Sequence, residues 1–297
     1  MSEPVQYIDR ATGERRTEAI YGEGFLRFTY GNPLGRLALH ALVKRAIFSR
    51  WFGWRMSRPA SRSRIAPFIR DYGLDPAEFA DPADSFGSFN EFFYRRLRPG
   101  ARPIHPSHSC AVLPADGRHL AFADASHAAG CYVKGRTLDL PALLADTDLG
   151  DHFARGPVVF SRLCPVDYHR FHFPVDGTAS APREVGGPLF SVNPVALAHD
   201  ISYLWRNKRW ITVIDSKYFG KVAMVEVGAT CVGATRYTFR PGAFLAKGDE
   251  KGCFEFGGSF VATLFEPGAI TLDADLLANT AAGLETYARM GERLGEA

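Results

Sequence analysis

Several patterns that define common protein classes are missing from this sequence. Its five cysteines are scattered and contain no Cys-x-x-Cys spacing, which excludes a zinc ribbon and a disulfide framework and favours a reducing compartment. No run of about 18 apolar residues is present, so we expect no transmembrane segment. No secretory signal is expected either, because no basic stretch followed by an apolar one opens the chain. The serine hydrolase pattern Gly-x-Ser-x-Gly is absent at Ser259, because Val261 occupies the place of its last glycine.

Acidic residues are absent between Glu23 and Asp71, where ten lysines and arginines occur. The whole chain has a net charge of only +3, so its positive charge is concentrated in this segment. Apolar residues recur at helical spacing over residues 33–52, with Trp51 and Trp54 near the end. A basic amphipathic helix ending in aromatic residues indicates a peripheral membrane anchor. The alternative is a helix packed on the protein core with a solvated basic face; nucleic-acid binding is disfavoured, because no reader motif accompanies the charge.

Shorter elements follow this basic segment. Residues 65–72 have helical spacing, and Ser88 with Glu91 three residues later forms a capping box that starts another helix. From Cys110 onward, short runs of β-branched and aromatic residues alternate with Gly, Pro and Asp, which predicts strands joined by tight turns. A helical pattern returns over residues 272–294.

Together these elements predict an α+β protein, with a mainly β, sandwich or barrel-like catalytic core and N-terminal amphipathic helices. We place a boundary near residue 75, between a basic, membrane-associating region of residues 1–75 and a catalytic domain of residues 76–297. With 297 residues and 46% apolar content, the chain is long enough to bury a substantial core.

Two glycines precede a serine at Gly257, Gly258 and Ser259, and runs that predict strands lie on both sides. Without Cβ atoms, the backbone before the serine can adopt conformations that are closed to other residues. A β-bulge without any chemistry would produce the same pattern. An aspartate before a glycine occurs at Asp116, where a structural turn is the simplest interpretation.

Histidine and aspartate gather between Asp167 and His172, a segment that also contains His169. On a strand, an offset of three residues sends His169 and His172 to opposite faces, which predicts different roles for them. On a helix they would share a face and could bind a metal, but Pro165 and Pro174 on either side disfavour a helix. A metal-dependent hydrolase built on Asp167, His169 and His172 is therefore an alternative, and we expect no metal.

Four short segments form a combined pattern along the chain: Glu91–Ile104, Pro114–Gly117, Asp167–His172 and Gly257–Gly268. Each is a weak signal alone. In this order and at this spacing, they resemble the phosphatidylserine decarboxylase family over most of the chain. The resemblance implies a proenzyme that cuts itself between Gly258 and Ser259, into a β chain of residues 1–258 and an α chain of residues 259–297.

The resemblance also implies roles for single residues. Asp116 orients His172, and His172 takes the proton of the Ser259 hydroxyl, which follows the logic of serine protease triads. The Ser259 oxygen then attacks the carbonyl carbon of Gly258, and β-elimination of the resulting ester with loss of ammonia leaves a pyruvoyl group on the α chain. A Schiff base between this group and the amine of the lipid provides the electron sink that decarboxylation requires. His169 is the candidate for proton transfer or substrate positioning.

The implied products are phosphatidylethanolamine and carbon dioxide, and the implied substrate is phosphatidylserine in an anionic membrane. A surface that gains about 1 kcal/mol per basic residue near such lipids would hold the enzyme on the cytoplasmic face of the cell membrane. The two chains are expected to stay associated, and the resemblance suggests a dimer of such units.

Phe260 departs from the family, in which many members have threonine or serine after the cleaved serine. We therefore expect a change in the shape or polarity of the pocket at that point. A different class of function is a non-catalytic lipid-binding module, in which the two glycines and the serine form only a bulge.

Overall fold

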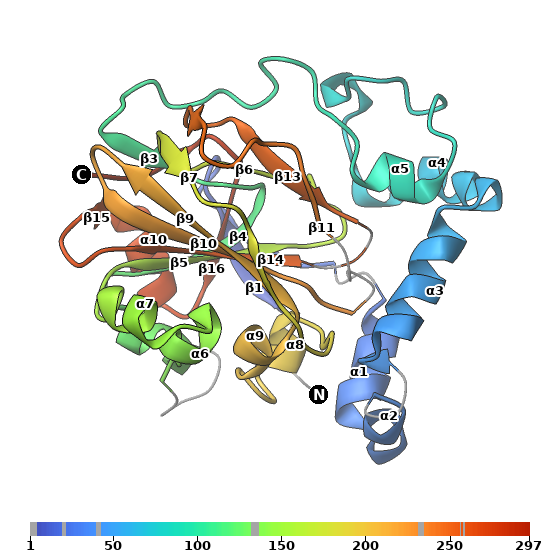
Figure 1. Ribbon diagram of the computed structural model, residues 1–297. Helices are drawn as coiled ribbons and strands as arrows, with labels where there is room; N and C mark the ends of the chain where they lie inside the picture. The colour runs from blue at the N-terminus through green and yellow to red at the C-terminus, as the bar shows by residue number, and fades with distance from the viewer. Residues whose placement is uncertain are drawn as a thin grey trace.

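The larger part of the molecule is built on one extended mixed sheet (Figure 1). The computed structural model describes residues 5–19, 22–39, 43–131, 137–230, 235–255, 257 and 259–297. Eleven strands of the described chain form the large sheet: β1 (Gln6–Asp9), β2 (Arg15–Thr17), β4 (Gly117–Phe122), β5 (Val158–Leu163), β7 (Gly177–Ala179), β8 (Arg183–Val185), β9 (Arg209–Ser216), β10 (Gly220–Val227), β12 (Phe244–Leu245), β14 (Ser259–Phe265) and β16 (Glu285–Ala288). Their order is β12-β7-β9-β10-β14-β5-β4-β16-β1-β2, with β8 paired to β9. Only the pairing of β1 with β16 is parallel among the described strands.

Two smaller sheets have three strands each. The first has the order β11-β13-β6, with bounds Thr235–Tyr237, Glu250–Phe254 and Arg170–His172. The second has the order β15-β17-β3, with bounds Thr271–Leu272, Arg293–Glu296 and Cys110–Val112. In Figure 1, β6 and β13 lie above the large sheet.

The α-helices of the described chain are α1 (Glu23–Gly31), α2 (Pro33–Ala38), α3 (Ala46–Met56), α4 (Ile65–Tyr72), α5 (Phe89–Phe93), α6 (Leu140–Leu144), α7 (Thr147–His152), α8 (Pro194–Leu197), α9 (Tyr203–Arg206) and α10 (Ala274–Ala281). Helices α6 to α9 occupy the other side of the large sheet, α10 packs into the core that β6 and β13 share, and α1 to α5 lie at one end of the molecule. Three 3-10 helices are described as well, η2 (Pro59–Arg64), η3 (Pro76–Glu78) and η4 (Ala125–Cys131). Helices α6 to α9 lie below the sheet in Figure 1, and none of the described helices is long and apolar enough to cross a bilayer.

Strand β14 lies in the interior of the large sheet, between β10 and β5, and all of its residues are buried. Phe260, Ala262 and Leu264 face a core shared with α6 and α9. Val261 and Phe265 face a second core, shared with β6 and β13. This alternation is the period of two that a strand imposes on its side chains, and it fixes the register of β14 because both of its faces are covered.

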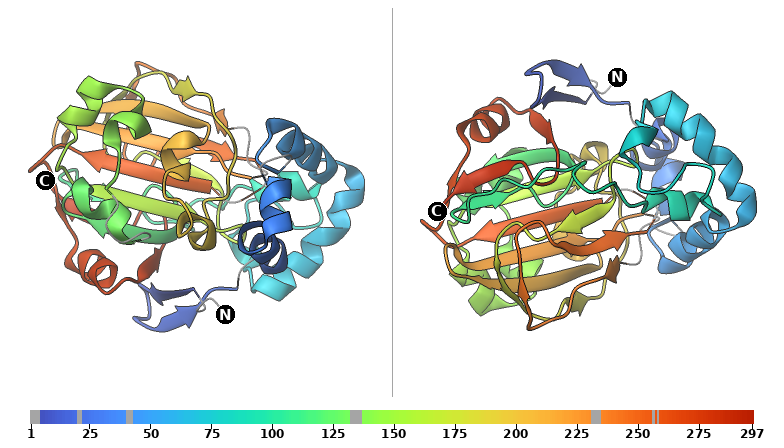
Figure 2. Two further views of the ribbon diagram at one scale, coloured as in Figure 1. Left: turned by 90° about the horizontal axis from the view of Figure 1, so that it is seen from below. Right: turned by 90° about the horizontal axis from the view of Figure 1, so that it is seen from above.

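The N-terminal helices form a separate layer at one end of the sheet (Figure 2). Their own core is aromatic and includes Phe68, Phe89, Phe92 and Phe93. This packing continues across residue 75, and the boundary proposed there stays a prediction.

The α+β class with N-terminal helices is confirmed. The large sheet ends at β12 and β2 in the described chain and does not close into a barrel. The capping box is confirmed in part, because the Ser88 side chain accepts a hydrogen bond from the Glu91 backbone N–H at 3.2 Å. The Glu91 carboxylate binds the N–H of Gly87 rather than that of Ser88, at 2.7 Å.

The single helix expected over residues 33–52 is wrong. Helix α2 ends at Ala38, and α3 begins at Ala46 after Arg45 takes an extended conformation with φ −84° and ψ 140°. The apolar side chains of α2 also do not pack on the core, since Leu34 and Leu37 are 70% and 68% exposed. The apolar spacing therefore predicted helical structure here. It predicted neither the break at Arg45 nor the exposure of the apolar side chains of α2.

The helical pattern over residues 272–294 is also wrong in its second half. Helix α10 ends at Ala281, and Gly283 adopts a positive φ of 75° that terminates the helical region. The chain then forms β16 and β17, because both find partners in strands far away in sequence.

Candidate active site

Ser259 is the first residue of β14, opposite Leu163 of β5. The chain reaches it from β13, which ends at Phe254 and belongs to a different sheet. The chain thus changes sheets between residues 254 and 259, and Gly258 lies outside the described residues. Ser259 is fully buried, and its Oγ has no hydrogen-bond partner in the described structure. An unpaired buried hydroxyl is unfavourable, which makes this oxygen a candidate for chemistry.

Gly257 has a φ of 139°, a conformation that side chains with a Cβ rarely adopt. The glycine at this position is therefore required by the backbone as it approaches Ser259. Strands flank this segment on both sides, as predicted.

His172 is the last residue of β6 and is held by two contacts. Its backbone N–H donates to the carbonyl of Pro114 at 2.7 Å, and its ring Nδ1 lies 2.9 Å from the carbonyl oxygen of Gly248. Because a carbonyl only accepts, Nδ1 carries the proton and Nε2 keeps its lone pair. Nε2 is buried without a partner among the described residues, and burial lowers the pKa of His172, so the imidazole is a neutral base.

His169 has the same electronic arrangement at a different place. Its Nδ1 lies 3.0 Å from the carbonyl oxygen of Asp167, which leaves the lone pair on Nε2, again buried and without a partner in the described structure. Burial lowers the pKa of His169 to about 3, while the backbone of Gly257 raises it, which places that residue beside the ring. The ring also packs on Phe93, with 3.9 Å between centroids. His169 is therefore the histidine that the structure brings next to the segment before Ser259.

Asp116 precedes β4 and is occupied by other partners. Arg102 binds its carboxylate through Nε and Nη2, with a shortest distance of 2.6 Å, and the backbone N–H of Met290 donates to Oδ1 at 2.8 Å. The described structure contains no hydrogen bond between Asp116 and His172. The Asp116 charge still acts on His172, raising its pKa slightly against the larger effect of burial.

The glycine after Asp116 is needed because of close packing. A Cβ on Gly117 would lie 2.6 Å from the carbonyl oxygen of Arg162. The Asp-Gly turn thus brings β4 close to β5, and the strand that leaves it runs antiparallel to β5.

The metal interpretation finds no support in the described residues. Arg118 binds the Asp167 carboxylate at 2.6 and 2.8 Å, and the N–H of Cys164 donates to it at 2.6 Å. The Nδ1 atoms of His169 and His172 are held by carbonyls. Within the described ranges, no three His, Cys, Asp or Glu side chains gather in the arrangement of a metal site.

Three arginines that support this site were not predicted from the sequence. Arg102 holds Asp116, Arg118 holds Asp167, and Arg162 binds Glu18 and Glu285 with shortest distances of 2.6 and 2.5 Å. Arg118 and Arg162 stand inside mostly apolar β-like runs, and a permanent charge in such a run is the signal that indicates a buried ion pair.

Phe260 points away from the site. It is fully buried and lies 5.2 Å from the Phe160 ring, in the core shared with the helices below the sheet. Because successive side chains of a strand alternate between faces, Ser259 and Phe260 face opposite sides of β14. The aromatic residue therefore contributes to packing and does not line the Ser259 side.

Comparison with known proteins gives one consistent result. A family model described as phosphatidylserine decarboxylase matches residues 89–296. A protein of Fusobacterium nucleatum named phosphatidylserine decarboxylase proenzyme is 41% identical over 293 residues, covering 99% of this chain and 98% of its own. Proteins with the same name from Chlamydia trachomatis and Chlamydia felis are 43% and 44% identical, covering 98% of this chain and 96% and 97% of their own.

Proposed function

The chain belongs to the phosphatidylserine decarboxylase family, and from this premise we propose that it matures by cutting itself before Ser259. Its activity is the conversion of phosphatidylserine into phosphatidylethanolamine and carbon dioxide, a carboxy-lyase step of phospholipid synthesis. The observation that carries the proposed maturation is the buried, unpartnered Oγ of Ser259, two residues after Gly257 with its positive φ.

The proposed cleavage uses residues of this chain only. A neutral imidazole takes the proton from Ser259 Oγ, and the oxygen attacks the carbonyl carbon of the preceding residue, Gly258. The Gly258–Ser259 C–N bond then breaks as its nitrogen takes up the proton, which leaves an ester through Oγ. β-Elimination of this ester releases the Gly258 carboxylate, and water then displaces the nitrogen of the remaining dehydroalanine as ammonia. We assign the base to His172, whose Nε2 lone pair is free of other contacts in the described structure and near which Asp116 supplies a negative charge. His169, beside Gly257, is assigned to positioning the substrate or moving a proton during decarboxylation.

The residues around Ser259 fit a pyruvoyl group at that position. The group is small, position 259 is fully buried, and the neutral ring of His169 lies beside Gly257, two residues before it. When present, the pyruvoyl carbonyl supplies the electron sink that decarboxylation of an amino acid needs. The buried setting excludes water, and the free Nε2 of His169 can hold or deliver a proton there.

Cleavage at this place would leave the α chain firmly bound. Residues 259–297 include β14 in the interior of the large sheet, β16 between β4 and β1, and β17 beside β3. The β and α chains would therefore remain joined by backbone hydrogen bonds and by both cores. The dimer suggested by the resemblance stays a prediction.

We also propose that α1 to α3 lie on an anionic lipid surface. Six of the eight exposed large apolar residues in the described chain belong to this region: Phe28, Leu34, Leu37, Ile47, Trp51 and Trp54. Arg55 and Arg58 lie over the Trp51 and Trp54 rings, at 5.8 and 4.6 Å from their centroids. Apolar and aromatic side chains surrounded by arginines are the composition of an interfacial helix. The proposed location is the cytoplasmic face of the cell membrane.

The maturation is tested by the intact mass of the denatured protein. The wild type should give two chains, the smaller of about 4 kDa by proportion from 32.7 kDa for 297 residues, with a blocked N-terminus. Ser259→Ala should remain at full length and inactive. Thr263→Val is the matched control, because Thr263 also has a buried, unpartnered hydroxyl on β14, and it should be cut normally.

The same assay separates the two histidines. His172→Ala should stay uncut, whereas His169→Ala should be cut and have little decarboxylase activity. Cleavage of Ser259→Ala would refute the proposed maturation, and an uncut His169→Ala with a normally cut His172→Ala would exchange the two roles.

A further inference from the structure

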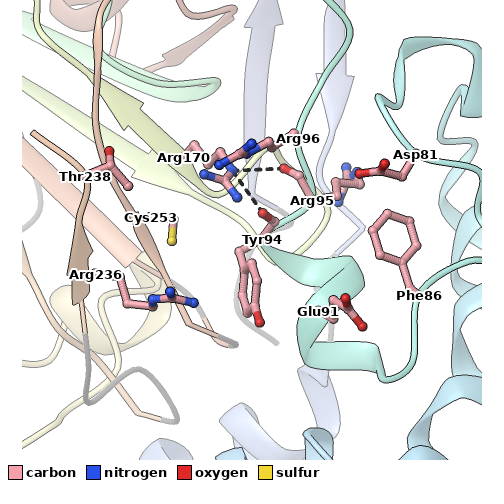
Figure 3. Close-up of a pocket in the computed structure, with 10 residues that line it drawn as sticks. All are labelled: Asp81, Phe86, Glu91, Tyr94, Arg95, Arg96, Arg170, Arg236, Thr238 and Cys253. Carbon is pink, nitrogen blue, oxygen red and sulfur yellow. Dashed lines mark hydrogen bonds between the residues drawn. The ribbon is translucent and has the colours of Figure 1, made fainter.

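A pocket of about 300 Å³ opens between helix α5 and the small sheet of β6, β11 and β13 (Figure 3). Four of its lining residues are arginines: Arg95 and Arg96 follow α5, Arg170 belongs to β6, and Arg236 belongs to β11. We call this the arginine pocket.

One of these arginines is occupied by structural contacts. Arg170 donates to the carbonyl oxygens of Tyr94 and Arg95 at 3.0 and 3.3 Å (Figure 3). It also donates to the Glu250 carboxylate at 2.7 Å. Arg170 therefore joins β6 to the segment after α5 and shapes the wall of the pocket.

Arg95 is a buried cation that forms no ion pair within the described residues, although the more distant charge of Asp116 acts on it. It is 5% exposed, its Nε has no hydrogen-bond partner in the described structure, and Nη1 lies 3.5 Å from the carbonyl oxygen of Phe92. Its guanidinium lies over the rings of Phe79 and Phe92, 4.8 Å from each centroid, and burial lowers its pKa to about 10. A buried charge is unfavourable unless an opposite charge compensates it. An anion in the pocket would provide that compensation.

Arg96 and Arg236 are exposed, and neither forms an ion pair within the described part of the chain. The pocket also contains two carboxylates, Asp81 and Glu91, and since Glu250 already pairs with Arg170, the three other arginines face two negative charges. Glu91 already accepts a backbone hydrogen bond, and Figure 3 shows Asp81 at the opposite end of the pocket from Arg236. The excess of positive charge and the unpaired guanidinium groups of Arg96 and Arg236 both favour an anionic ligand; Arg236 also lies over the Tyr94 ring, 5.9 Å from its centroid.

The pocket lies next to the candidate active site. Arg95 lowers the pKa of His169, and Phe93, two residues before Arg95, packs on the His169 ring. Cys253, which also lines the pocket, is paired with Arg170 in the small sheet, and β13 leads from it toward Ser259. A ligand held by the arginines would therefore have its remaining atoms close to His169.

We propose that the arginine pocket binds the phosphodiester of the lipid headgroup, with Arg96 and Arg236 contacting its oxygens and Arg95 supplying the charge behind them. This inference rests on the proposed function. The planar, forked guanidinium suits a phosphate with two exposed oxygens. In phosphatidylserine only two carbons separate the phosphodiester oxygen from the amine, so a lipid held here presents its amine and carboxylate to the neighbouring site.

The kinetic test uses Arg96→Gln, Arg236→Gln and the double variant in fully cut enzyme, with phosphatidylserine in mixed micelles of fixed detergent content. The double variant should raise KM about tenfold or more, because charge-assisted hydrogen bonds are lost, and should leave kcat within about twofold. Arg240→Gln is the matched control, since Arg240 is exposed, lies four residues after Arg236 and does not line the pocket; its KM should be unchanged. A reduced kcat with an unchanged KM would overturn the proposal.

A binding measurement does not depend on activity. The uncut Ser259→Ala chain is titrated calorimetrically with glycerophosphoserine, the soluble headgroup, and with inorganic phosphate. Glycerophosphoserine should bind, and adding Arg96→Gln and Arg236→Gln should weaken it about tenfold or more. Equal affinity for inorganic phosphate would mean that the pocket binds free phosphate. Equal binding of glycerophosphoserine by the variant would mean that Arg96 and Arg236 do not contribute to its recognition. Both results overturn the proposal.

The two proposals can fail separately. If the wild type stays uncut while glycerophosphoserine binds through Arg96 and Arg236, the maturation fails and the pocket assignment holds. If the wild type is cut and active and the double variant keeps the wild-type KM and affinity, only the pocket assignment fails.

Discussion

The large sheet and the N-terminal helices use the same kinds of side chain in opposite ways. All residues of β14 are buried, and both of its faces contact a hydrophobic core. In α2 and α3, by contrast, Leu34 and Ile47 expose 70% and 69% of their surface. Apolar residues in the sheet determine whether the chain folds, whereas those in the helices are available for an outside surface. The two regions should therefore respond to substitution in different assays.

The largest effect on stability is expected in the sheet. Phe160→Ala removes a buried ring that packs on Phe260 at 5.2 Å, and it should lower the free energy of unfolding by about 3–5 kcal/mol. The measurement is denaturant unfolding in the Ser259→Ala background, in which the chain is continuous. Binding to anionic vesicles should not change while the protein is folded. A loss of less than about 1 kcal/mol would contradict the assignment of this core as the stabilising one.

Acidification by one pH unit should have a smaller effect than the Phe160→Ala substitution, and it again comes from the sheet region. Burial lowers the pKa of both His119 and His169 to about 3, so the folded state takes up fewer protons than the unfolded state between about pH 3 and 6.5. Their contribution is complete above pH 6.5 and is lost as the pH falls, at up to about 1.4 kcal/mol per pH unit for each histidine.

His119→Gln isolates this contribution. Between pH 6 and 5, most carboxylates stay ionised, and the slope of the unfolding free energy against pH should fall by about one proton in this variant. The midpoint of unfolding can shift for other reasons, so the slope is the decisive readout. An unchanged slope would mean that His119 is not held neutral in the folded protein.

The smallest effect on stability is expected in the helices. Trp51 and Trp54 are 49% and 56% exposed, so replacing both by Ala should change the free energy of unfolding by less than about 0.5 kcal/mol for each. Binding to anionic vesicles in a sedimentation assay should nevertheless weaken by roughly tenfold. The control pair is Tyr218→Ala with Phe244→Ala, because these exposed aromatic residues lie in the sheet region, at 45% and 72% exposure. Equal vesicle binding by the two double variants would refute the proposed lipid surface.

Local signals in the sequence predicted local structure well. The Ser88 cap and the strands on both sides of Gly257 were predicted, because each depends on residues a few positions apart. The break at Arg45 was not predicted, since the apolar spacing continues through it. The strands after Gly283 were not predicted either, because their partners β4, β1 and β3 lie far away in the sequence.

In the candidate active site, too, local sequence signals were predictive and long-range contacts were not. The residues Asp116, His169, His172 and Ser259 were identified from short motifs, and the structure buries all four. Their hydrogen-bond partners were not predictable, since the carbonyl that fixes the His172 tautomer belongs to Gly248, 76 residues away. A motif shows which groups take part, and the fold decides which atom of each group remains free.

The change of sheet between β13 and β14 has a consequence for refolding. In the uncut chain, β14 is covalently tied to the strand before it while it enters its place between β10 and β5. If the chain is cut there as proposed, the same insertion becomes an encounter between two separate molecules, which depends on concentration and competes with aggregation of an exposed apolar strand. Unfolding of the mature protein should therefore be irreversible in practice, and its lifetime is then set by the rate at which it unfolds. The proenzyme would be the only form that can reach the native structure unaided.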